Sequence, residues 1–490
     1  MTPDAAPRAG TDAEAGRAAP PPITTSPPVG LGQRLLHVVY DLTIGVVWLT
    51  TLPLCLLIGV ARPALARKAL SLSTFGLVKL PPPDPERPRV LVHGVSVGEI
   101  KASQSLVAAL SAHHEVVVSA FSDTGLQVAG QLFPDTTIVR YPFDFRPLVS
   151  RFWRRVRPDY VLLVELEAWP CFLRAANRRG APVAVVSGRI TERSYRRYRM
   201  FGSLPEFGRI SLFAAQDEAY AARFTSLAAS DERVLVTGNV KVDGLNAERS
   251  DTDRKAVEEL RRVAGLDGDG GPEFVVVAGS THEPEEVAFV EAMREHVPDA
   301  RLVLVPRHPE RCPRVVDDLA GVLGSDARPE RLSLLRDEGR TCPPDRPLVV
   351  DTIGELERVY GLADAVFIGG SLIPHGGQNM MEPASQGLPV LYGPHVQNFL
   401  RETETLEASG AALRVADADA LGREMARLRG DEATRRAMGE AGRAAVAAGR
   451  GATQATLEAL RERCGLAAAG TGPTSATGRQ GAPTRLSSGN

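Results

Sequence analysis

A carboxylate stands at the start of a predicted helix in the stretch RVLVHGVSVGEIKA, residues 89–102. The run Val90–Val92 is apolar, a turn with glycines follows it, and Ser96 and Glu99 then occur with the spacing S-x-x-E. This spacing is that of a capping box, in which each side chain satisfies a free backbone N–H at the helix start. A carboxylate at the end of a strand is also suited to general base catalysis. On these residues alone, both the cap and the catalyst stay open.

A glycine-rich loop follows a strand in the second half of the chain, in the stretch GGSLIPHGGQNMMEPASQGLPVLYGP, residues 369–394. We expect a helix to begin near Asn379, where free N–H groups and the helix dipole would favour a phosphate. Glu382 would lie one turn in, placed to accept hydrogen bonds from sugar hydroxyls. The alternative is a structural loop in which Glu382 is a solvated helix carboxylate.

Two further strand-end loops in this half carry polar residues. The stretch VPRHPER, residues 305–311, places Arg307 and His308 after a strand, where a guanidinium suits a phosphate or a carboxylate. A structural salt bridge is the alternative. In AGSTHEPEE, residues 278–286, Ser280 and Thr281 are expected to cap the next helix, and ligand contact there is compatible with capping.

The first half of the chain offers two loops of its own. The stretch LVELEAWPC carries Glu165 and Glu167 at the end of a strand. The stretch SGRITERSYRRYRMFG, residues 187–202, begins with Arg189 and interleaves arginines with aromatic side chains, which suits a membrane surface or a phosphorylated lipid. A solvated helix face with its aromatics packed inward is the alternative. The histidines show no spacing that indicates a metal site.

The elements that position these loops alternate short apolar strands with helix-length segments, which is typical of parallel α/β sheets. The predicted strands of the first sheet are Val90–Val92, Val116–Ala120, Thr137–Tyr141, Tyr160–Val164, Val183–Val186, Leu212–Ala215 and Val234–Thr237. Those of the second are Phe274–Ala278, Leu302–Val305, Leu348–Val350, Ala365–Ile368, Val390–Tyr392 and Leu413–Val415.

The expected fold class is α/β, with two Rossmann-like, doubly wound domains that face a cleft, at residues 85–243 and 273–465. A polar linker, 244–272, joins them. Residues 1–30 and 466–490 are expected to be disordered tails. The net charge of −2 gives no global field for nucleic acid, so no nucleic-acid partner is expected. The five scattered cysteines fit a reducing compartment.

Residues 31–68 are predicted to form a membrane anchor, because Leu42–Val60 contains no charge over a length close to that of a bilayer span. Basic residues follow this run, at Arg62, Arg67 and Lys68, which predicts that the body of the chain is cytoplasmic. A cleaved signal peptide is the weaker alternative. Pro53 leaves open a helix that only embeds in the interface.

Seven motifs in this order resemble the 3-deoxy-D-manno-octulosonic acid (Kdo) transferases of lipopolysaccharide assembly: HGVSVGE, VELEAWP, GNVKVD, AGSTHEPEE, VPRHPER, IGELERVYGLAD and GGSLIPHGGQNMMEP. The resemblance covers about residues 34–462 and includes the N-terminal anchor. It implies a GT-B glycosyltransferase that binds the acceptor in the first domain and CMP-Kdo in the second, without a cofactor or a metal. It also implies that the enzyme works on the cytoplasmic face of the cell inner membrane.

The resemblance assigns Glu99 as the catalytic base, which deprotonates the hydroxyl of a lipid A precursor (lipid IVA) in an inverting transfer. It places Ser96, Glu165 and Arg189 on the acceptor side. It assigns binding of the CMP-Kdo donor to nine residues: Ser280, Thr281, Arg307, His308, Gly354, Glu355, Leu356, Asn379 and Glu382. The family usually has Asn at the positions of Cys171 and Ser187 and His at that of Gln378, so acceptor positioning and fine donor contacts differ in this chain.

Three other functions are compatible with parts of the sequence. A GT-B transferase that uses another nucleotide sugar shares the fold, and so does a non-hydrolysing UDP-sugar 2-epimerase. The epimerase needs neither an anchor nor an acceptor site, so Leu42–Val60 and the basic aromatic stretch favour the transferase. A non-enzymatic lipid-binding protein would have no use for Glu99 together with a phosphate loop.

Overall fold

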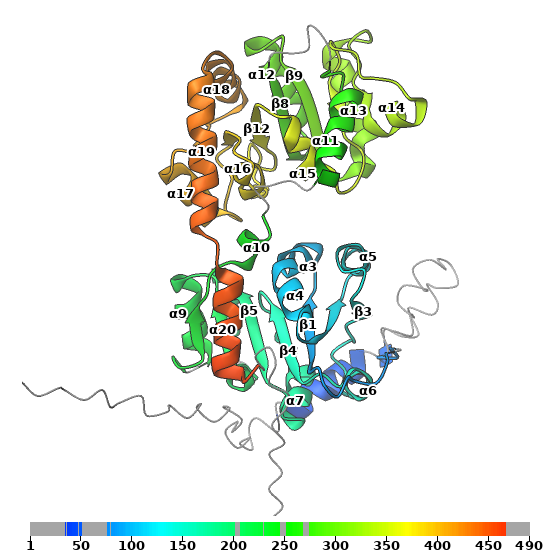
Figure 1. The fold of residues 1–490 in the computed structure, drawn as a ribbon, viewed down its shortest axis with the longest axis vertical. Helices are drawn as coiled ribbons and strands as arrows, with labels where there is room; N and C mark the ends of the chain where they lie inside the picture. The colour runs from blue at the N-terminus through cyan, green and yellow to red at the C-terminus, as the bar shows by residue number, and fades with distance from the viewer. Residues whose placement is uncertain are drawn as a thin grey trace, which may run out of the picture. The chain divides into compact units, whose positions relative to one another are not determined.

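The computed structural model describes residues 35, 37–47, 49–50, 76–78, 80–200, 206–228, 230–245, 251–267 and 274–466. The described residues up to Val240, together with those from Ala452 onward, form one compact unit, and the described residues from Lys241 to Gly451 form a second (Figure 1). The predicted tail 1–30, nearly all of the tail 466–490 and the anchor residues 51–68 lie outside the described residues.

The first unit contains a parallel sheet of seven strands in the order β3-β2-β1-β4-β5-β6-β7. Its interior strands are nearly all apolar because both faces are covered, by separate clusters of buried side chains. The strands are β1 Arg89–Gly94, β2 Glu115–Ala120, β3 Thr137–Arg140, β4 Tyr160–Val164, β5 Val183–Gly188, β6 Leu212–Ala215 and β7 Val234–Val236.

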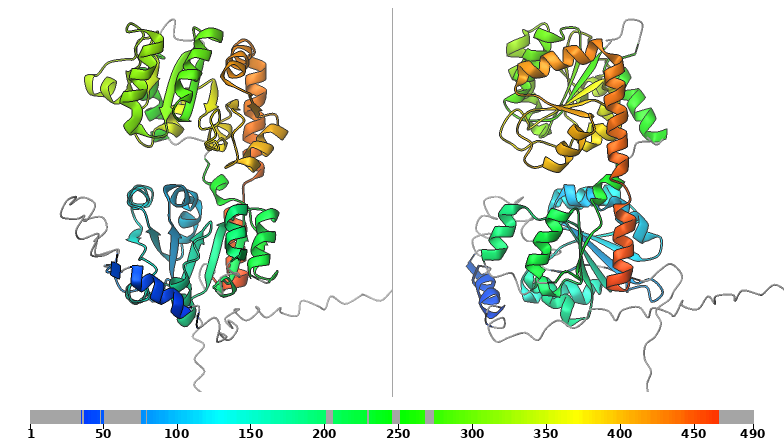
Figure 2. Two further views of the ribbon diagram at one scale, coloured as in Figure 1. Left: turned by 180° about the vertical axis from the view of Figure 1, so that it is seen from behind. Right: turned by 90° about the vertical axis from the view of Figure 1, so that its left-hand side faces the viewer.

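The helices of the first unit lie on both faces of this sheet (Figures 1 and 2). Each predicted strand of the unit is confirmed to within about two residues at its ends. The helices are α3 Val97–Ala102, α4 Gln104–Ser111, α5 Asp123–Leu132, α6 Arg146–Val156, α7 Pro170–Arg178, α8 Glu192–Met200, the 3-10 turn η2 Phe207–Arg209, α9 Glu218–Ala228, α10 Val240–Asp243 at the unit boundary, and α20 Ala452–Cys464.

The second unit repeats this plan with strand order β10-β11-β9-β8-β12-β13-β14, again all parallel. The six predicted strands are confirmed, and the sheet has one more, β10. That strand is two residues long and consists of Glu330 and Arg331, so it carries no apolar run that the sequence could reveal. The strands are β8 Val275–Thr281, β9 Arg301–Pro306, β10 Glu330–Arg331, β11 Leu348–Val349, β12 Ala365–Ile368, β13 Val390–Tyr392 and β14 Ala412–Arg414.

The helices of the second unit again cover both faces of the sheet (Figure 2). They are α11 Asp251–Val263, α12 Glu285–His296, the 3-10 turn η3 Pro309–Arg311, α13 Cys312–Leu323, α14 Leu332–Glu338, α15 Leu356–Val359, η4 Tyr360–Leu362, α16 Met381–Ser385, α17 Leu400–Ala408, α18 Ala418–Gly430 and α19 Glu432–Ala448.

The structure differs from the expected domain boundaries in two places. Helix α11 lies inside the expected linker and buries Leu260 in the core of the second unit. Helix α20, expected in the second domain, belongs to the first unit, where Leu457 and Leu460 pack against strands of its sheet. The Tyr160 hydroxyl donates to the carbonyl of Gly465 at 2.7 Å. Helical periodicity predicts that such segments are helices but does not say which sheet they cover.

Residues 37–47 are helical and lie against the first unit through polar side chains. The Tyr40 hydroxyl donates to Asp144 at 2.9 Å, Arg174 donates to Asp41 at 2.7 Å, and His37 contacts Glu206 at 2.7 Å. Within the described part of the chain, no helix combines the length and the apolar character needed to cross a membrane.

Candidate active site

Glu99 lies just beyond the carboxyl end of β1, in the first turn of α3. Its Oε2 accepts from the backbone N–H of Val95 at 2.7 Å, and its Oε1 accepts from the Ser96 hydroxyl at 2.8 Å. The Ser96 Oγ in turn accepts from the Glu99 N–H at 3.4 Å. The predicted capping arrangement is therefore present. The Glu99 side chain remains half-buried at the end of the sheet where loops from several strands meet.

Close packing fixes the position of Glu99. A Cβ added at Gly94 would lie 3.0 Å from the Cβ of Glu99 and 3.3 Å from the side chain of Ile100. A residue larger than glycine at the end of β1 would therefore push the carboxylate out of place.

The loops after β4 and β5 lie next to the Glu99 loop, because β1 pairs with β4 and β4 pairs with β5 in parallel. Glu165 directly follows β4, and Ser187 is the last residue but one of β5; both have a positive φ, of 64° and 51°. The backbone N–H of Arg189 donates to the carbonyl of Glu165 at 3.3 Å. Such conformations are costly outside glycine and cluster at functional sites. The predicted acceptor-side residues Ser96, Glu165 and Arg189 thus come from neighbouring loops.

Glu167 is a second carboxyl group of this edge. Its pKa is raised to about 7, chiefly by burial and also by the negative charges of Glu99 and Glu165, against the hydrogen bond from Trp169. The Trp169 Nε1–H donates to it at 3.0 Å. The sequence prediction placed only Glu165 in the site. The E-x-E pattern after the strand, however, indicated that Glu167 as well as Glu165 lies at the carboxyl end of the sheet.

His93 lies on β1 but takes no part in this edge chemistry. It is fully buried, stacks on Tyr141 with ring centroids 3.8 Å apart, and its Nδ1 lies 3.0 Å from the Ser119 hydroxyl. Burial lowers its pKa to about 3, so the ring stays neutral. We interpret it as a core residue beneath the Glu99 loop.

In the second unit, the loops after β8, β9 and β12 meet because these strands are neighbours. Close approach is required at Gly369, where an added Cβ would lie 2.5 Å from the Ser280 carbonyl oxygen and 2.5 Å from the Thr281 Cα. Thr281 is fully buried, and its hydroxyl has no hydrogen-bond partner among the described residues.

The expected capping of the next helix by Ser280 and Thr281 is wrong, because no side chain caps the start of α12. Glu285 instead reaches back from the first turn and accepts from the backbone N–H of His282 at 2.7 Å and of Gly370 at 2.5 Å. Burial raises the pKa of Glu285 to about 7. One buried carboxyl group therefore ties the β8 loop to the glycine-rich loop.

Three imidazoles gather at this edge. The ring of His282 lies 3.9 Å from that of His375 and 5.9 Å from that of His308, measured between centroids. The pKa of His282 is lowered to about 4, chiefly by burial and also by the positive charges of His375, His308, Arg311 and Arg307. The sequence prediction found Arg307 and His308, both exposed, but not His282 or His375. The positive charge of Arg307 beside these rings suits an anionic ligand.

Asn379 and Glu382 are joined by a hydrogen bond from the Asn379 Nδ2 to the Glu382 Oε1, at 3.0 Å. The helix here begins at Met381, two residues later than expected, and is only five residues long. The Asn379 Oδ1 accepts from the Met381 N–H at 3.1 Å. It therefore satisfies one of the N–H groups at the helix start that have no partner within the helix. Glu382 consequently lies in the first turn, not one turn in.

Of the residues with predicted donor contacts, Gly354 and Glu355 lie in the turn before α15, and Leu356 is the first residue of that helix. The Glu355 carboxylate accepts from Arg336 at 3.0 Å, and the same guanidinium binds Glu259 at 2.9 Å. Gly354 has a φ of 86°, a conformation that glycine adopts without strain. One oxygen of Glu355 is thus held in an ion pair, the other is buried without a hydrogen-bond partner among the described residues, and the donor contact of residues 354–356 stays a prediction.

Among the described residues, one group has the spacing of metal ligands, Glu295, His296 and Asp419. It lies on α12 and α18, and His296 already contacts Asp419 at 2.8 Å. None of the predicted site residues belongs to it.

Comparison with known proteins supports one family. The family profile described as "3-Deoxy-D-manno-octulosonic-acid transferase (kdotransferase)" matches residues 72–244. The 3-deoxy-D-manno-octulosonic acid transferase of Haemophilus influenzae is 31% identical over 79% of this chain and 89% of its own length. That of Bordetella pertussis is 34% identical over 80% and 91%.

The fold comparison is broader than the sequence comparison. A crystal structure of a putative UDP-N-acetylglucosamine 2-epimerase from Listeria monocytogenes matches with a TM-score of 0.53 and 15% identity, over 78% of this chain and 98% of that one. At this identity the likeness shows only a GT-B-like pair of Rossmann-like units. The choice between transferase and epimerase therefore rests on the sequence relatives. The chain belongs to the 3-deoxy-D-manno-octulosonic acid transferase family and is a glycosyltransferase of lipopolysaccharide biosynthesis.

Proposed function

We propose that this chain transfers Kdo from CMP-Kdo to a hydroxyl of a lipid A precursor such as lipid IVA, with inversion at the anomeric centre and without a metal ion. The acceptor hydroxyl attacks the face of the sugar opposite the leaving CMP and loses its proton to Glu99. The new bond joins the acceptor oxygen to the anomeric carbon, and the bond from that carbon to the CMP phosphate breaks.

The observation that carries this proposal is the placement of Glu99. Its carboxylate is half-buried at the carboxyl end of the sheet and accepts from the Val95 N–H and the Ser96 hydroxyl. Both contacts suit an ionised, acceptor-only carboxylate. Glu167 has a pKa of about 7, raised by burial and by the negative charge of Glu99. It therefore holds a proton more readily than an ordinary carboxyl group. Two carboxyl groups with divergent environments are typical of acid–base sites.

The second unit supplies groups suited to the leaving nucleotide. Arg307 and His308 are exposed at the edge of the sheet, and the Thr281 hydroxyl beside them is buried without a partner among the described residues. A guanidinium binds phosphate oxygens bidentately, and a donor aimed at developing charge stabilises a transition state. These residues supply positive charge to the departing phosphate. Asn379 and Glu382, joined to each other, are proposed to bind phosphate and ribose.

We also propose that residues 31–68 attach the chain to the cytoplasmic face of the inner membrane. The support is the apolar face of the helical residues 37–47 and their neighbours. Leu35, Leu42 and Leu49 are 64%, 64% and 78% exposed, and Val38 and Val46 are 53% and 58% exposed. The opposite, polar face contacts the first unit. A helix with this division suits the interface of a bilayer.

The test of the transfer reaction is CMP release from enzymatically generated CMP-Kdo, with and without a tetraacylated lipid A precursor. Native chain and Glu99→Gln are compared, each with and without EDTA. We expect acceptor-dependent release that survives EDTA and is lost in folded Glu99→Gln. If the folded native enzyme releases no CMP on adding acceptor, another nucleotide sugar becomes the better proposal. Loss of release with EDTA would overturn metal independence.

A further inference from the structure

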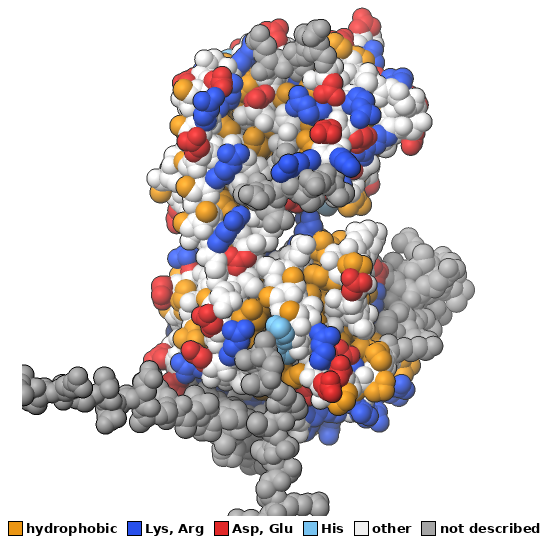
Figure 3. All heavy atoms as spheres, in the orientation of Figure 1, with side chains coloured by type: hydrophobic (Ala, Val, Ile, Leu, Met, Phe, Trp, Pro, Cys, Tyr) orange, Lys and Arg blue, Asp and Glu red, His pale blue; other side chains and the backbone are white. Residues whose placement is uncertain are grey.

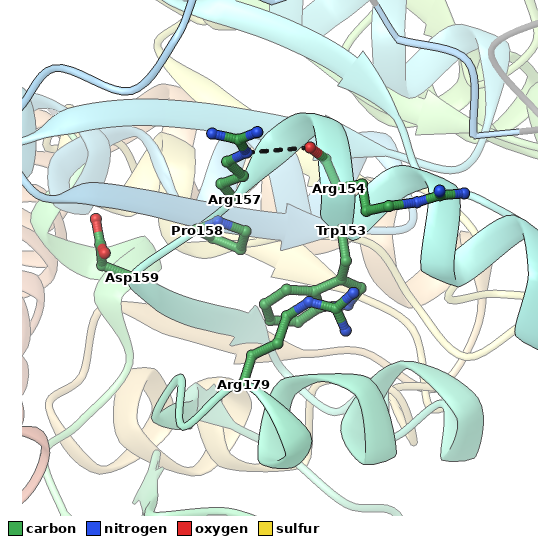
Figure 4. Close-up of a pocket in the computed structure, with 6 residues that line it drawn as sticks. All are labelled: Trp153, Arg154, Arg157, Pro158, Asp159 and Arg179. Carbon is green, nitrogen blue, oxygen red and sulfur yellow. Dashed lines mark hydrogen bonds between the residues drawn. The ribbon is translucent and has the colours of Figure 1, made fainter.

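A cavity of about 400 Å³ lies in the first unit, away from the candidate active site. It is formed where α6 ends, β4 begins and α7 ends, and it is lined by Trp153, Arg154, Arg157, Pro158, Asp159 and Arg179 (Figure 4). β4 runs from Tyr160 to Val164, so the cavity is at the amino end of the sheet and Glu165 and Glu167 follow the carboxyl end. The two sites occupy opposite edges of one sheet.

The charge of the cavity is unusual for this chain. Three of the lining residues are arginines, and none of them pairs with a carboxylate in the part of the chain that the structure describes. Neighbouring arginines do pair: Arg89 binds Glu115, and Arg174 binds Asp41. The one lining carboxylate, Asp159, accepts from the backbone N–H of Arg89 at 2.7 Å. Lys and Arg side chains also gather at the lower edge of this unit in Figure 3, over the region of α6.

Two of the arginines, Arg179 and Arg157, are held in place by contacts that leave most of their donors unused. The Arg179 guanidinium lies over the Trp153 ring, 5.4 Å from its centroid, and its Nη1 makes a long contact of 3.4 Å with the Ala175 carbonyl (Figure 4). The Arg157 Nε donates to the carbonyl of Arg154 at 3.2 Å. Each guanidinium has five N–H donors, so several remain for a ligand.

Two features of the cavity are energetically costly. Arg157 ends α6 in the left-handed conformation, with φ 48° and ψ 54°, at a position where glycine is usual and a side chain costs energy. Trp153 is 1% exposed, and its indole N–H has no partner among the described residues. A buried unsatisfied donor is costly and is expected where a partner is missing.

The electrostatic field here is positive. Burial and the charge of Arg154 lower the pKa of Arg179. Burial lowers the pKa of Arg178, and the charges of Arg146, Arg174 and Arg179 lower it further. The positive charges of neighbouring guanidiniums repel one another. A bound anion would reduce this repulsion, so anion binding is favourable at this place.

We propose that the cavity lined by Arg154, Arg157 and Arg179 binds a phosphate group, separate from the groups that react at the opposite edge of the sheet. Guanidiniums match phosphate oxygens in geometry and charge, and the cavity is large enough for a phosphate ester. The phosphate belongs either to a soluble molecule or to a lipid headgroup. This assignment is independent of the proposed transfer reaction.

The test uses the full chain in a phosphate-free buffer. One arm titrates inorganic phosphate and follows binding by calorimetry. The other arm measures how much protein sediments with phosphatidylcholine vesicles that contain or lack phosphatidic acid. Attachment through the predicted anchor contributes to both measurements, so their difference reports binding to phosphatidic acid. The variants are Arg157→Gly, which keeps the left-handed conformation without a side chain, and the triple variant Arg154→Gln, Arg157→Gly, Arg179→Gln.

The matched control is the triple variant Arg423→Gln, Arg427→Gln, Arg436→Gln. It also removes three positive charges, but from exposed positions on α18 and α19 of the second unit. We expect the cavity triple variant to lose at least about tenfold in affinity for one of the two probes, with Arg157→Gly intermediate. Thermal unfolding and acceptor-dependent CMP release are measured on every variant, so that misfolding and loss of transfer are recognised separately.

Each outcome decides the proposal. Loss of inorganic phosphate binding in the cavity variants assigns a soluble ligand. Loss only of the phosphatidic acid dependence assigns a headgroup. Equal binding by the cavity triple variant and the control, or no binding of either probe by the native chain, overturns the proposal.

Discussion

The Ser96 hydroxyl donates to Oε1 of Glu99 at 2.8 Å, so the group proposed as the base also completes the start of α3. Capping and catalysis are thus not exclusive in this loop. The cap fixes the position of the carboxylate at the carboxyl end of the sheet.

Variants at the two positions separate these roles. Glu99→Gln keeps an oxygen that can accept from Val95 but cannot take a proton, so we expect kcat to fall by about 10²- to 10⁴-fold with little loss of stability. Ser96→Ala removes the cap and is expected to cost about 1 kcal/mol of unfolding free energy, and to lower kcat much less than Glu99→Gln because the carboxylate itself remains. Acceptor-dependent CMP release and urea denaturation measure both. Full activity in Glu99→Gln would leave Glu99 as a helix cap only.

The raised pKa of Glu167 predicts a pH-dependent stability. The folded chain holds this proton up to about pH 7, whereas the ordinary value is 4.5, so folding takes up a proton between these values. The contribution of Glu167 is therefore fully present below about pH 4.5 and is lost as the pH rises through 7. We expect Glu167→Gln to be more stable than the native chain at pH 8, by up to about 3 kcal/mol, with the difference shrinking toward pH 5.

The measurement is urea denaturation from pH 5 to pH 8. Glu440→Gln, at an exposed position on α19, is the control and should show no such trend. A constant difference between native chain and Glu167→Gln across this range would contradict the assigned burial of the proton.

Gly369→Ala tests the close contact of two loops in the second unit. The new methyl group would lie 2.5 Å from the Ser280 carbonyl oxygen and from the Thr281 Cα, both backbone atoms that cannot move alone. We expect a loss of about 1–3 kcal/mol or more in unfolding free energy and weaker donor binding. Gly321→Ala, on α13 with no atom within 4 Å of the added Cβ, should instead be neutral or gain up to about 1 kcal/mol. Equal stability of the two variants would refute the predicted clash.

Asp144 connects the N-terminal helical residues to the first unit. It accepts from the backbone N–H groups of Cys171 and Phe172 at 2.8 and 2.9 Å, at the start of α7, and from the Tyr40 hydroxyl. Asp144→Ala should therefore cost about 1–2 kcal/mol, because two N–H groups lose their acceptor. Tyr40→Phe removes one hydroxyl and should cost about 1 kcal/mol or less.

The two variants should differ in a second measurement, limited proteolysis. Both are expected to speed cleavage near residues 37–47, because each removes the Tyr40–Asp144 hydrogen bond, one of the three polar contacts that hold this helix. Only Asp144→Ala should also lower the midpoint of global unfolding clearly. Unchanged proteolysis in both would mean that the Asp41–Arg174 pair suffices to hold the helix.

The sequence alone determined the periodic parts of this protein. Strands such as Tyr160–Val164 and Ala365–Ile368 are fully or nearly apolar because parallel sheets are covered on both faces, and their ends were predicted exactly as found. Parallel strands bring their carboxyl ends to one edge, so the predicted residues Glu99, Glu165 and Arg189 had to come from neighbouring loops. The family resemblance followed from the motifs in these loops.

Only the tertiary structure decided which groups act on one another. The proximity of Glu167 to Glu99, of His282 to His375 and of Glu285 to Gly370 joins residues from different loops, and no periodicity encodes such contacts. The same holds for α20, whose helical pattern is local but whose place on the first sheet depends on the apolar surface that sheet leaves uncovered. Local patterns reflect backbone geometry, whereas burial, pKa and charge depend on neighbours that only the folded chain assembles.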